Sequence, residues 1–255
     1  MKKPKILIVN DDGIFSEGIK ALWEAMNELG DTFIAAPSRE KSAASHSITL
    51  NHPIRVKLIE RANGFQGWAI SGTPVDCTKL AIRSLMSDKP DLLVSGINHG
   101  ANLGTNIVYS GTVSAAMEGS ILGIPSIAFS LASRKTHYFL AAKEIAKKVA
   151  TRVMNTGLPN GTLLNVNIPN CDVENIQGIK ITKQGNQFFK DQFDERINPR
   201  NQKYYWIKGE MVDEHTSTYS DSLAIKENYA SITPIHYKLT NDSIMDDLKD
   251  LFVND

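Results

Sequence analysis

The fold is decided near the start of this 255-residue chain, by the stretch Ile6-Leu7-Ile8-Val9-Asn10-Asp11-Asp12-Gly13. Its four apolar residues, three of them β-branched, predict a buried strand that leads directly into two adjacent carboxylates and a glycine. In a parallel α/β sheet the carboxyl ends of the strands open into the crevice that binds ligands. Neighbouring carboxylates repel each other, and a site that keeps both ionised usually contains a cation. The stretch therefore indicates metal chemistry at a sheet edge.

The first half of the chain alternates segments with strand and helix patterns. Helices are expected over 19–29, with Gly30 as C-cap, over 74–85, where Thr73 caps and Pro74 takes the first turn, and over 113–122. Strands are expected over residues 6–9, 32–36, 92–95 and 124–131, and extended segments of a hairpin arm over 49–59 and 67–71. Repeated βα units of this kind predict a three-layer α/β/α, Rossmann-like fold with a mostly parallel, mixed sheet.

The second half is less regular. Residues 184–201 are polar and are expected to form a loop-like arm. Strands are expected over residues 162–168, 176–182, 204–207 and 229–234, and helices over 138–154 and 242–252.

Composition narrows the class of protein. Lys plus Arg and Asp plus Glu both number 28, which argues against a nucleic-acid polymer as the main ligand. The two cysteines, Cys77 and Cys171, are far apart and outside any CxxC motif, so a reducing cytoplasm is expected. No apolar run approaches the roughly 20 residues of a membrane span. We therefore expect a soluble cytoplasmic protein with no membrane partner.

Three further polar segments follow predicted strands or precede a helix. The loop 38–47 contains Ser42, and the loop 96–112 contains Asn98 and Asn102. The end of that second loop, residues 109–112, opens a helix with Ser110, Gly111 and Thr112. Taken singly, each is an ordinary solvated loop or N-cap. Together they are expected to meet Asp11 and Asp12 at one edge of the sheet, with a phosphate cradle at the helix N-terminus. An oxygen-only ligand set suits Mg²⁺, Mn²⁺ or Ca²⁺ rather than zinc.

Six motifs follow one another along the chain: Asn10-Asp11-Asp12-Gly13, Ser42-Ala43-Ala44-Ser45, Gly72-Thr73-Pro74-Val75-Asp76-Cys77, Ser95-Gly96-Ile97-Asn98-His99-Gly100-Ala101-Asn102-Leu103-Gly104, Tyr109-Ser110-Gly111-Thr112 and Ala116-Met117-Glu118-Gly119. In this order they resemble the SurE family, also called survival protein E, whose members are metal-dependent 5′/3′-nucleotidases. The resemblance is dense over residues 5–131 and resumes at Ser231-Ile232-Thr233-Pro234-Ile235-His236.

The resemblance implies one divalent cation per subunit (Mg²⁺, Mn²⁺ or Ca²⁺) with the ligands Asp11, Asp12, Ser42 and Asn98. It places phosphate on Ser110, Gly111 and Thr112, with Asn102 nearby. It also implies a catalytic core over 1–135 and a C-terminal part, 136–255, that completes the sheet and forms arms exchanged within a homodimer or homotetramer. The implied activity is hydrolysis of nucleoside monophosphates, with 3′-nucleotides and polyphosphate as further candidate substrates.

In this scheme the cation activates water against the phosphomonoester, and Asp11 or Asp12 accepts the proton. Three alternatives stay open. A haloacid-dehalogenase-like phosphatase needs Asp-x-Asp, but Gly13 stands where the second aspartate would be. A non-catalytic nucleotide sensor would use the same cradle, and a mainly structural oligomer would use the C-terminal arm. The sequence leaves open the preferred base and sugar, the physiological cation and the choice between dimer and tetramer.

Overall fold

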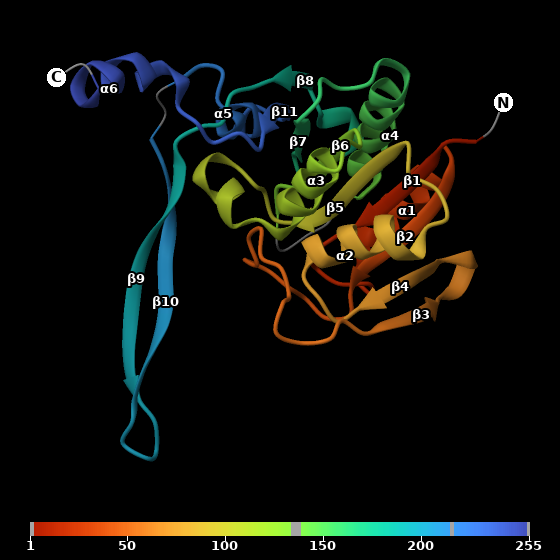
Figure 1. Cartoon of the computed structure of the whole chain (residues 1–255), viewed down its shortest axis with the longest axis horizontal. Helices are drawn as coiled ribbons and strands as arrows, with labels where there is room; N and C mark the ends of the chain where they lie inside the picture. The colour runs from red at the N-terminus through yellow and green to blue at the C-terminus, as the bar shows by residue number, and fades with distance from the viewer. Residues whose placement is uncertain (1–2, 134–138, 215–216, 254–255) are drawn as a thin grey trace.

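The computed structural model describes residues 3–133, 139–214 and 217–253. These residues form a nine-stranded mixed sheet with helices packed on its two faces (Figure 1). The strand order is β3-β4-β2-β1-β5-β6-β7-β11-β8. The neighbouring strands in the run β4-β2-β1-β5-β6-β7 are parallel, and so are β11 and β8. The pairs β3–β4 and β7–β11 are antiparallel. The expected α/β/α architecture with a mostly parallel sheet is confirmed.

The elements have the following bounds. The sheet consists of β1 (Lys5–Val9), β2 (Asp31–Pro37), β3 (Val56–Glu60), β4 (Gln66–Ile70), β5 (Leu92–His99), β6 (Ser126–Leu131), β7 (Thr162–Ile168), β8 (Gly178–Ile181) and β11 (Tyr229–His236). A separate hairpin consists of β9 (Gln187–Ile197) and β10 (Lys203–Asp213). The α-helices are α1 (Glu17–Asn27), α2 (Pro74–Leu80), α3 (Gly111–Ile121), α4 (Phe139–Thr156), α5 (Asp221–Lys226) and α6 (Met245–Phe252).

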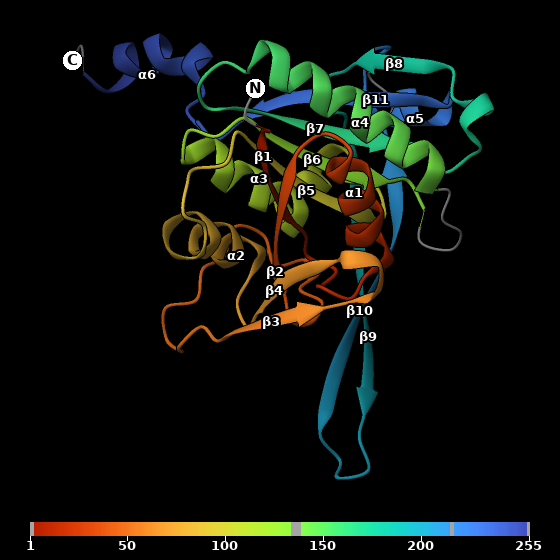
Figure 2. The same cartoon turned by 90° about the vertical axis from the view of Figure 1, so that its right-hand side faces the viewer.

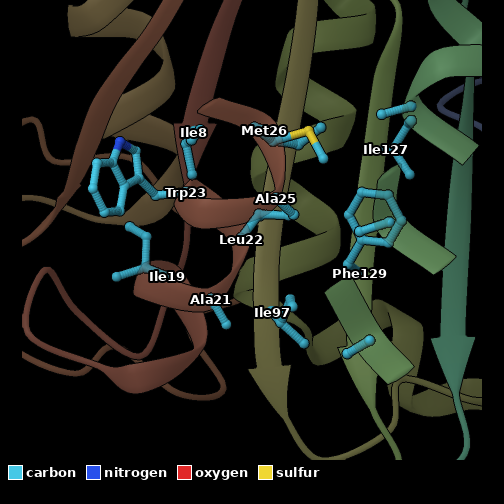
Figure 3. Packing of buried hydrophobic residues seen from close by; sticks show 14 of the residues in the cluster. Ile8, Ile19, Ala21, Leu22, Trp23, Ala25, Met26, Ile97, Ile127 and Phe129 are labelled. Carbon is cyan, nitrogen blue, oxygen red and sulfur yellow. The ribbon is translucent and has the colours of Figure 1, made fainter. Parts of the chain in front are cut away.

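Strand β1 lies at the centre of the sheet, and its side chains alternate between two cores. Ile6 and Ile8 pack with α1 and α4 on one face, and Leu7 and Val9 pack with α2 and α3 on the other. All four side chains are fully buried. Figure 3 shows the first face, where Leu22 and Met26 of α1 lie over the strands beside Phe129 of β6. A strand covered on both faces carries a continuous apolar run, which is the pattern at residues 6–9.

Local sequence signals explain two of the helix starts. Ser16 caps α1 by accepting a hydrogen bond from the backbone N–H of Ile19. Thr73 and Asp76 form a reciprocal capping box at the start of α2, with Pro74 in the first turn. The prediction of Gly30 as a C-cap is wrong, because α1 ends at Asn27 with Glu28 as its C-cap, and Gly30 serves close packing instead. A Cβ on Gly30 would lie 2.3 Å from the Pro4 carbonyl oxygen.

Several expected boundaries need correction. Strand β5 continues through Gly96, Ile97 and Asn98 to His99, although a loop was expected from Gly96 onward. Pairing with β6 resumes at Asn98 after a register shift, so tertiary pairing overrides the poor strand propensity of this stretch. The hairpin β3–β4 is part of the sheet rather than a free arm, because β4 pairs with β2. Tyr138, where the helix over 138–154 is expected to begin, lies outside the described residues. The expected boundary between the catalytic core and the C-terminal part, at 135–136, also lies outside them.

The polar segment 184–201 is not a loop, because most of it is strand β9. Strands β9 and β10 pair over eleven residues each and project away from the sheet in both views (Figures 1 and 2). The short strand expected over 204–207 is therefore part of the first half of β10. Large apolar side chains along this ribbon are exposed, among them Phe193, Trp206 and Ile207. Helix α6 also stands away from the sheet with Leu251 and Phe252 exposed.

Candidate metal and phosphate site

Asp11 and Asp12 follow β1 at the carboxyl edge of the parallel strands, where four segments meet. Asp11 is 4% exposed, and the Thr112 hydroxyl donates a hydrogen bond to its Oδ1. The backbone N–H of Lys41 donates to the Asp11 carbonyl oxygen over 2.8 Å. The backbone N–H of His99 donates to Asp12 Oδ2 over 3.2 Å. The loops after β1, β2 and β5 and the start of α3 thus converge at the two carboxylates.

The electrostatics of this pair favour a cation. Burial raises the pKa of Asp11 from 3.8 to about 6. The hydrogen bond from Thr112 lowers this pKa, and the charge of Asp12 raises it further. A buried carboxylate beside a second one is costly to ionise unless positive charge is near. Because a positive ion would lower that cost, the pair fits a bound cation.

The N-terminus of α3 presents backbone N–H groups directly beside Asp11. A Cβ on Gly111 would lie 2.8 Å from the Asp11 Cβ and 3.0 Å from its Oδ2, so a larger residue would displace the carboxylate. Ser110 caps the helix by accepting from the Val113 N–H over 3.1 Å. The first N–H groups of a helix have no partner within it and, with the helix dipole, favour an anion. Carboxylates and an anion cradle therefore share one corner of the fold.

Ser42 and Asn98 lie on the segments that border this corner. The Ser42 side chain is exposed, and its hydroxyl donates to Glu40 Oε1 over 2.5 Å. Its chain neighbour Lys41 is the residue anchored to Asp11. Asn98 is half-buried at the end of β5, and its side-chain N–H donates to the Gly100 carbonyl oxygen over 2.8 Å. That bond directs the nitrogen end of the amide toward Gly100, so the oxygen end is the one suited to a cation.

Asn102 has a more structural setting than the other expected phosphate contacts. One side-chain N–H donates to Ser130 Oγ over 2.8 Å, and its backbone N–H donates to Asn167 Oδ1 over 2.7 Å. Its carbonyl oxygen accepts from the side chains of Asn165 and Asn167. Asn102 is buried among β6 and β7, and its observed bonds fix the start of the segment that leads to Ser110.

A second cluster, which the sequence alone did not single out, holds the loop 38–47 in place. Glu118 of α3 is nearly buried, and its two carboxylate oxygens bind His46 and Lys79, each over 2.9 Å. The hydrogen bond from His46, with help from Lys79, holds the pKa of Glu118 below its usual value although burial opposes this. These residues are far apart in the chain, so no spacing rule could group them.

Within the described ranges, no group of three or more His, Cys, Asp or Glu side chains that could hold a metal ion is found. The four ligands expected from the sequence, Asp11, Asp12, Ser42 and Asn98, would offer two carboxylates, a hydroxyl and an amide oxygen. Such an oxygen-only set suits hard cations such as Mg²⁺, Mn²⁺ or Ca²⁺. The residues present therefore fit a divalent cation. Among the same ranges no helix is long and apolar enough to traverse a bilayer.

Comparison with known proteins agrees with this geometry. The family described as "Survival protein SurE" matches residues 6–191. The chain belongs to the SurE family. The family match spans β1, the loop 38–47, the end of β5 and the start of α3, so every candidate site segment lies within it.

Named SurE relatives resemble this chain along almost its full length. The 5′-nucleotidase SurE of Heliobacterium modesticaldum is 44% identical over 96% of this chain and 91% of its own. That of Trichormus variabilis is 46% identical, with 96% and 97% covered. The crystal structure of the SurE protein from Aquifex aeolicus superposes with a TM-score of 0.83 at 44% identity, covering 97% of this chain and 99% of that one. The likeness thus includes the C-terminal half with its hairpin.

Proposed function

We propose that this SurE-family chain is a metal-dependent 5′-nucleotidase that hydrolyses nucleoside monophosphates to nucleoside and inorganic phosphate. The observation that carries the proposal is the contact between Asp11 and the N-terminus of α3, where the Thr112 hydroxyl binds the carboxylate and Gly111 lies against it. A cation site and a phosphate cradle in direct contact suit a phosphomonoester. The names of the full-length relatives support the same substrate class.

In this proposal Asp11, Asp12, Ser42 and Asn98 hold one divalent cation per subunit, Mg²⁺, Mn²⁺ or Ca²⁺. When bound, such a cation supplies Lewis-acid polarisation and charge neutralisation at the phosphoryl group. The buried setting of Asp11 and the oxygen character of the four donors support this assignment. The physiological ion is a matter for experiment.

The chain's own groups then orient the phosphate and manage the proton. The backbone N–H of Gly111 binds a phosphate oxygen, and the Ser110 hydroxyl, which accepts from Val113, can donate a hydrogen bond to another. The backbone N–H and the hydroxyl of Thr112 hold the Asp11 carboxylate beside this cradle. A carboxylate oxygen of Asp11 or Asp12 accepts the proton that the attacking water loses. The P–O bond to the nucleoside breaks as the new P–O bond forms, and the leaving oxygen takes a proton from solvent water. The hydrogen bonds between the Asn102 backbone and the side chains of Asn165 and Asn167 fix the start of the segment that leads to this cradle.

Phosphate release from a panel of nucleoside 5′-monophosphates tests the proposal. We expect release with Mg²⁺ or Mn²⁺ and none after chelation with EDTA. 3′-Monophosphates and polyphosphate belong in the same panel because the cradle recognises the phosphate rather than the sugar. Nucleotide binding by calorimetry without turnover in any of the three cations would refute the enzyme and favour a sensor. A trapped aspartyl-phosphate would instead favour the covalent alternative.

We also propose that the chain works as a homodimer or homotetramer in the cytoplasm. Phe193 and Ile207 lie opposite each other on the ribbon β9–β10, and are 67% and 65% exposed. An exposed apolar pair on a long projecting ribbon favours a second copy as its cover. The free thiols Cys77 and Cys171 suit a reducing compartment. Sedimentation should show an oligomer that Phe193→Ser/Ile207→Ser reduces to monomer, whereas Lys203→Ala should not. A monomeric wild type would refute the assembly.

A further inference from the structure

The segment from Asn102 to Thr112 links the phosphate cradle to the C-terminal half of the chain. Its central turn, Gly104–Tyr109, is a 3-10 helix. At its far end, the Tyr109 carbonyl accepts from the Ser45 N–H over 3.1 Å, and the Val108 carbonyl accepts from the Ser45 hydroxyl over 2.9 Å. The turn therefore contacts the loop that contains Ser42 as well as leading into Ser110. A shift of this turn would move both sides of the site.

At its near end the turn is held by Asp221 of α5. Asp221 is fully buried, and its Oδ2 accepts the backbone N–H of Gly104 over 3.0 Å. Its Oδ1 accepts the N–H groups of Gly185, over 3.0 Å, and of Ser222, over 2.8 Å. One carboxylate thus joins the turn beside the site, the segment that leads into β9 and the start of α5. Each of these hydrogen bonds is charge-assisted and stronger than a neutral one.

The root of the hairpin also touches the turn through backbone atoms. Gly104 has φ +54°, and a Cβ on it would lie 2.3 Å from the Gln187 carbonyl oxygen. The Thr105 hydroxyl donates to that same carbonyl over 3.2 Å, and the Gln184 side chain donates to the Gly104 carbonyl over 3.0 Å. Because the backbone of Gly104 lies directly against the backbone of Gln187, a movement of the hairpin root would also move the turn.

We propose that Asp221 is a positioning residue that couples the β9–β10 hairpin to the phosphate cradle. It fixes the Gly104–Tyr109 turn against the hairpin root, and the turn sets the positions of Ser110, Gly111 and Thr112. Asp221 itself touches no substrate. Whatever holds the hairpin, above all a second copy of this chain, thereby tunes phosphate binding. The inference rests on the proposed nucleotidase function and adds a regulatory connection to that same site.

The variant Asp221→Asn tests the connection with little change in size. An amide offers one acceptor in place of two, so the bond to Gly104 or the bonds to Gly185 and Ser222 must fail. We expect the KM for a nucleoside monophosphate to rise roughly tenfold, the effect of losing about one such bond. The inhibition constant for inorganic phosphate should rise by the same factor. The kcat at saturating cation should change less than twofold, a split that general loss of stability would not produce. The half-activating cation concentration should rise with the KM, because the turn also contacts the loop that contains Ser42.

Asp213→Asn is the matched control, because Asp213 accepts from the Ser222 hydroxyl over 3.2 Å and pairs with Lys226 in the same cluster, whereas the Gly104 N–H donates to Asp221. It should leave the KM unchanged. A wild-type KM in Asp221→Asn, or an equal rise in Asp213→Asn, would overturn the proposal.

Thr105→Val supplies a second variant should Asp221→Asn fail to fold, since it deletes one hydroxyl bond to the hairpin root at nearly constant volume. A KM increase of about threefold is expected, and no increase would contradict the coupling. Calorimetry with inorganic phosphate measures the phosphate affinity of each variant, and this measurement does not depend on turnover. If wild-type protein binds phosphate but hydrolyses no nucleotide, the proposed function fails, whereas weaker phosphate binding by Asp221→Asn would still support the coupling.

Discussion

Gly111→Ala should damage the candidate site more than its modest size suggests. The added Cβ would lie 2.8 Å from the Asp11 Cβ, whereas ordinary contacts begin at 3.4 Å, so the two groups must separate by about 0.6 Å. A 1 Å misplacement of a catalytic group costs on the order of 100-fold in rate, so we expect kcat/KM to fall roughly 10- to 100-fold. This loss corresponds to about 1.4 to 2.7 kcal/mol of transition-state stabilisation. The half-activating concentration of Mg²⁺ or Mn²⁺ should rise in parallel.

Gly119→Ala provides the matched control on the same helix. Its Cβ would lie 2.4 Å from Ser126 Oγ and 2.8 Å from Leu93 Cδ1, far from Asp11 along α3. Both variants overpack the core and should lose about 1–3 kcal/mol of unfolding free energy. Phosphate release is measured at equal folded fraction, across a cation titration, after thermal unfolding has been recorded for each variant. Wild-type cation activation in Gly111→Ala, or the same kinetic loss in Gly119→Ala, would refute the reasoning.

Three further predictions follow from the same corner of the fold. Asp12→Asn should keep the wild-type circular dichroism spectrum but lower turnover by about 100-fold or more, because one of the two proposed anionic cation ligands is lost; wild-type turnover would remove Asp12 from the site. A cation at about 100 times its Kd should raise the unfolding free energy by about 2.7 kcal/mol in urea titrations, and Asp12→Asn should lose this gain. Burial would raise the pKa of Asp76, but hydrogen bonds from Thr49 and Thr73 outweigh it and lower that pKa in the folded protein. The ionised Asp76 therefore stabilises the fold at pH values above its pKa in the unfolded chain. This contribution is lost as the pH falls through the lower pKa of the folded state. Asp76→Ala should therefore cost about 1 kcal/mol at pH 7 and less at pH 3, and an equal cost at both pH values would contradict this account.

The sheet could be predicted from sequence because burial leaves a readable pattern. Ile6 to Val9 form a continuous apolar run because β1 is covered on both faces. The start of α2 is predicted by Thr73 and Asp76, which form its capping box. The rule that parallel strands end at one edge places Asp11, Asp12 and Asn98 near each other. The contact between Thr112 and Asp11 lies beyond that rule, because it depends on how α3 packs beside β1.

The hairpin escaped prediction for a physical reason. Period-two alternation arises when one face of a strand is buried, and most residues of β9 and β10 are exposed in the single chain. Phe193 and Ile197 are therefore mixed with charged residues without a regular apolar face. The bonds of Asp221 were equally hidden, since its partners Gly104 and Gly185 contribute backbone N–H groups that any residue except proline could supply.

The position of Asp221 along the chain has a consequence for synthesis on the ribosome. The carboxylates, the Asn98 strand end and the start of α3 have all been translated once Thr112 is complete, but the residue that fixes the intervening turn follows about a hundred residues later. At about 5–20 residues per second, that interval lasts on the order of 5–20 s. During this time the nascent chain carries all four proposed cation ligands, but the residue proposed to fix the turn before the cradle is not yet made. A segment translated late thus completes a site whose residues are translated early.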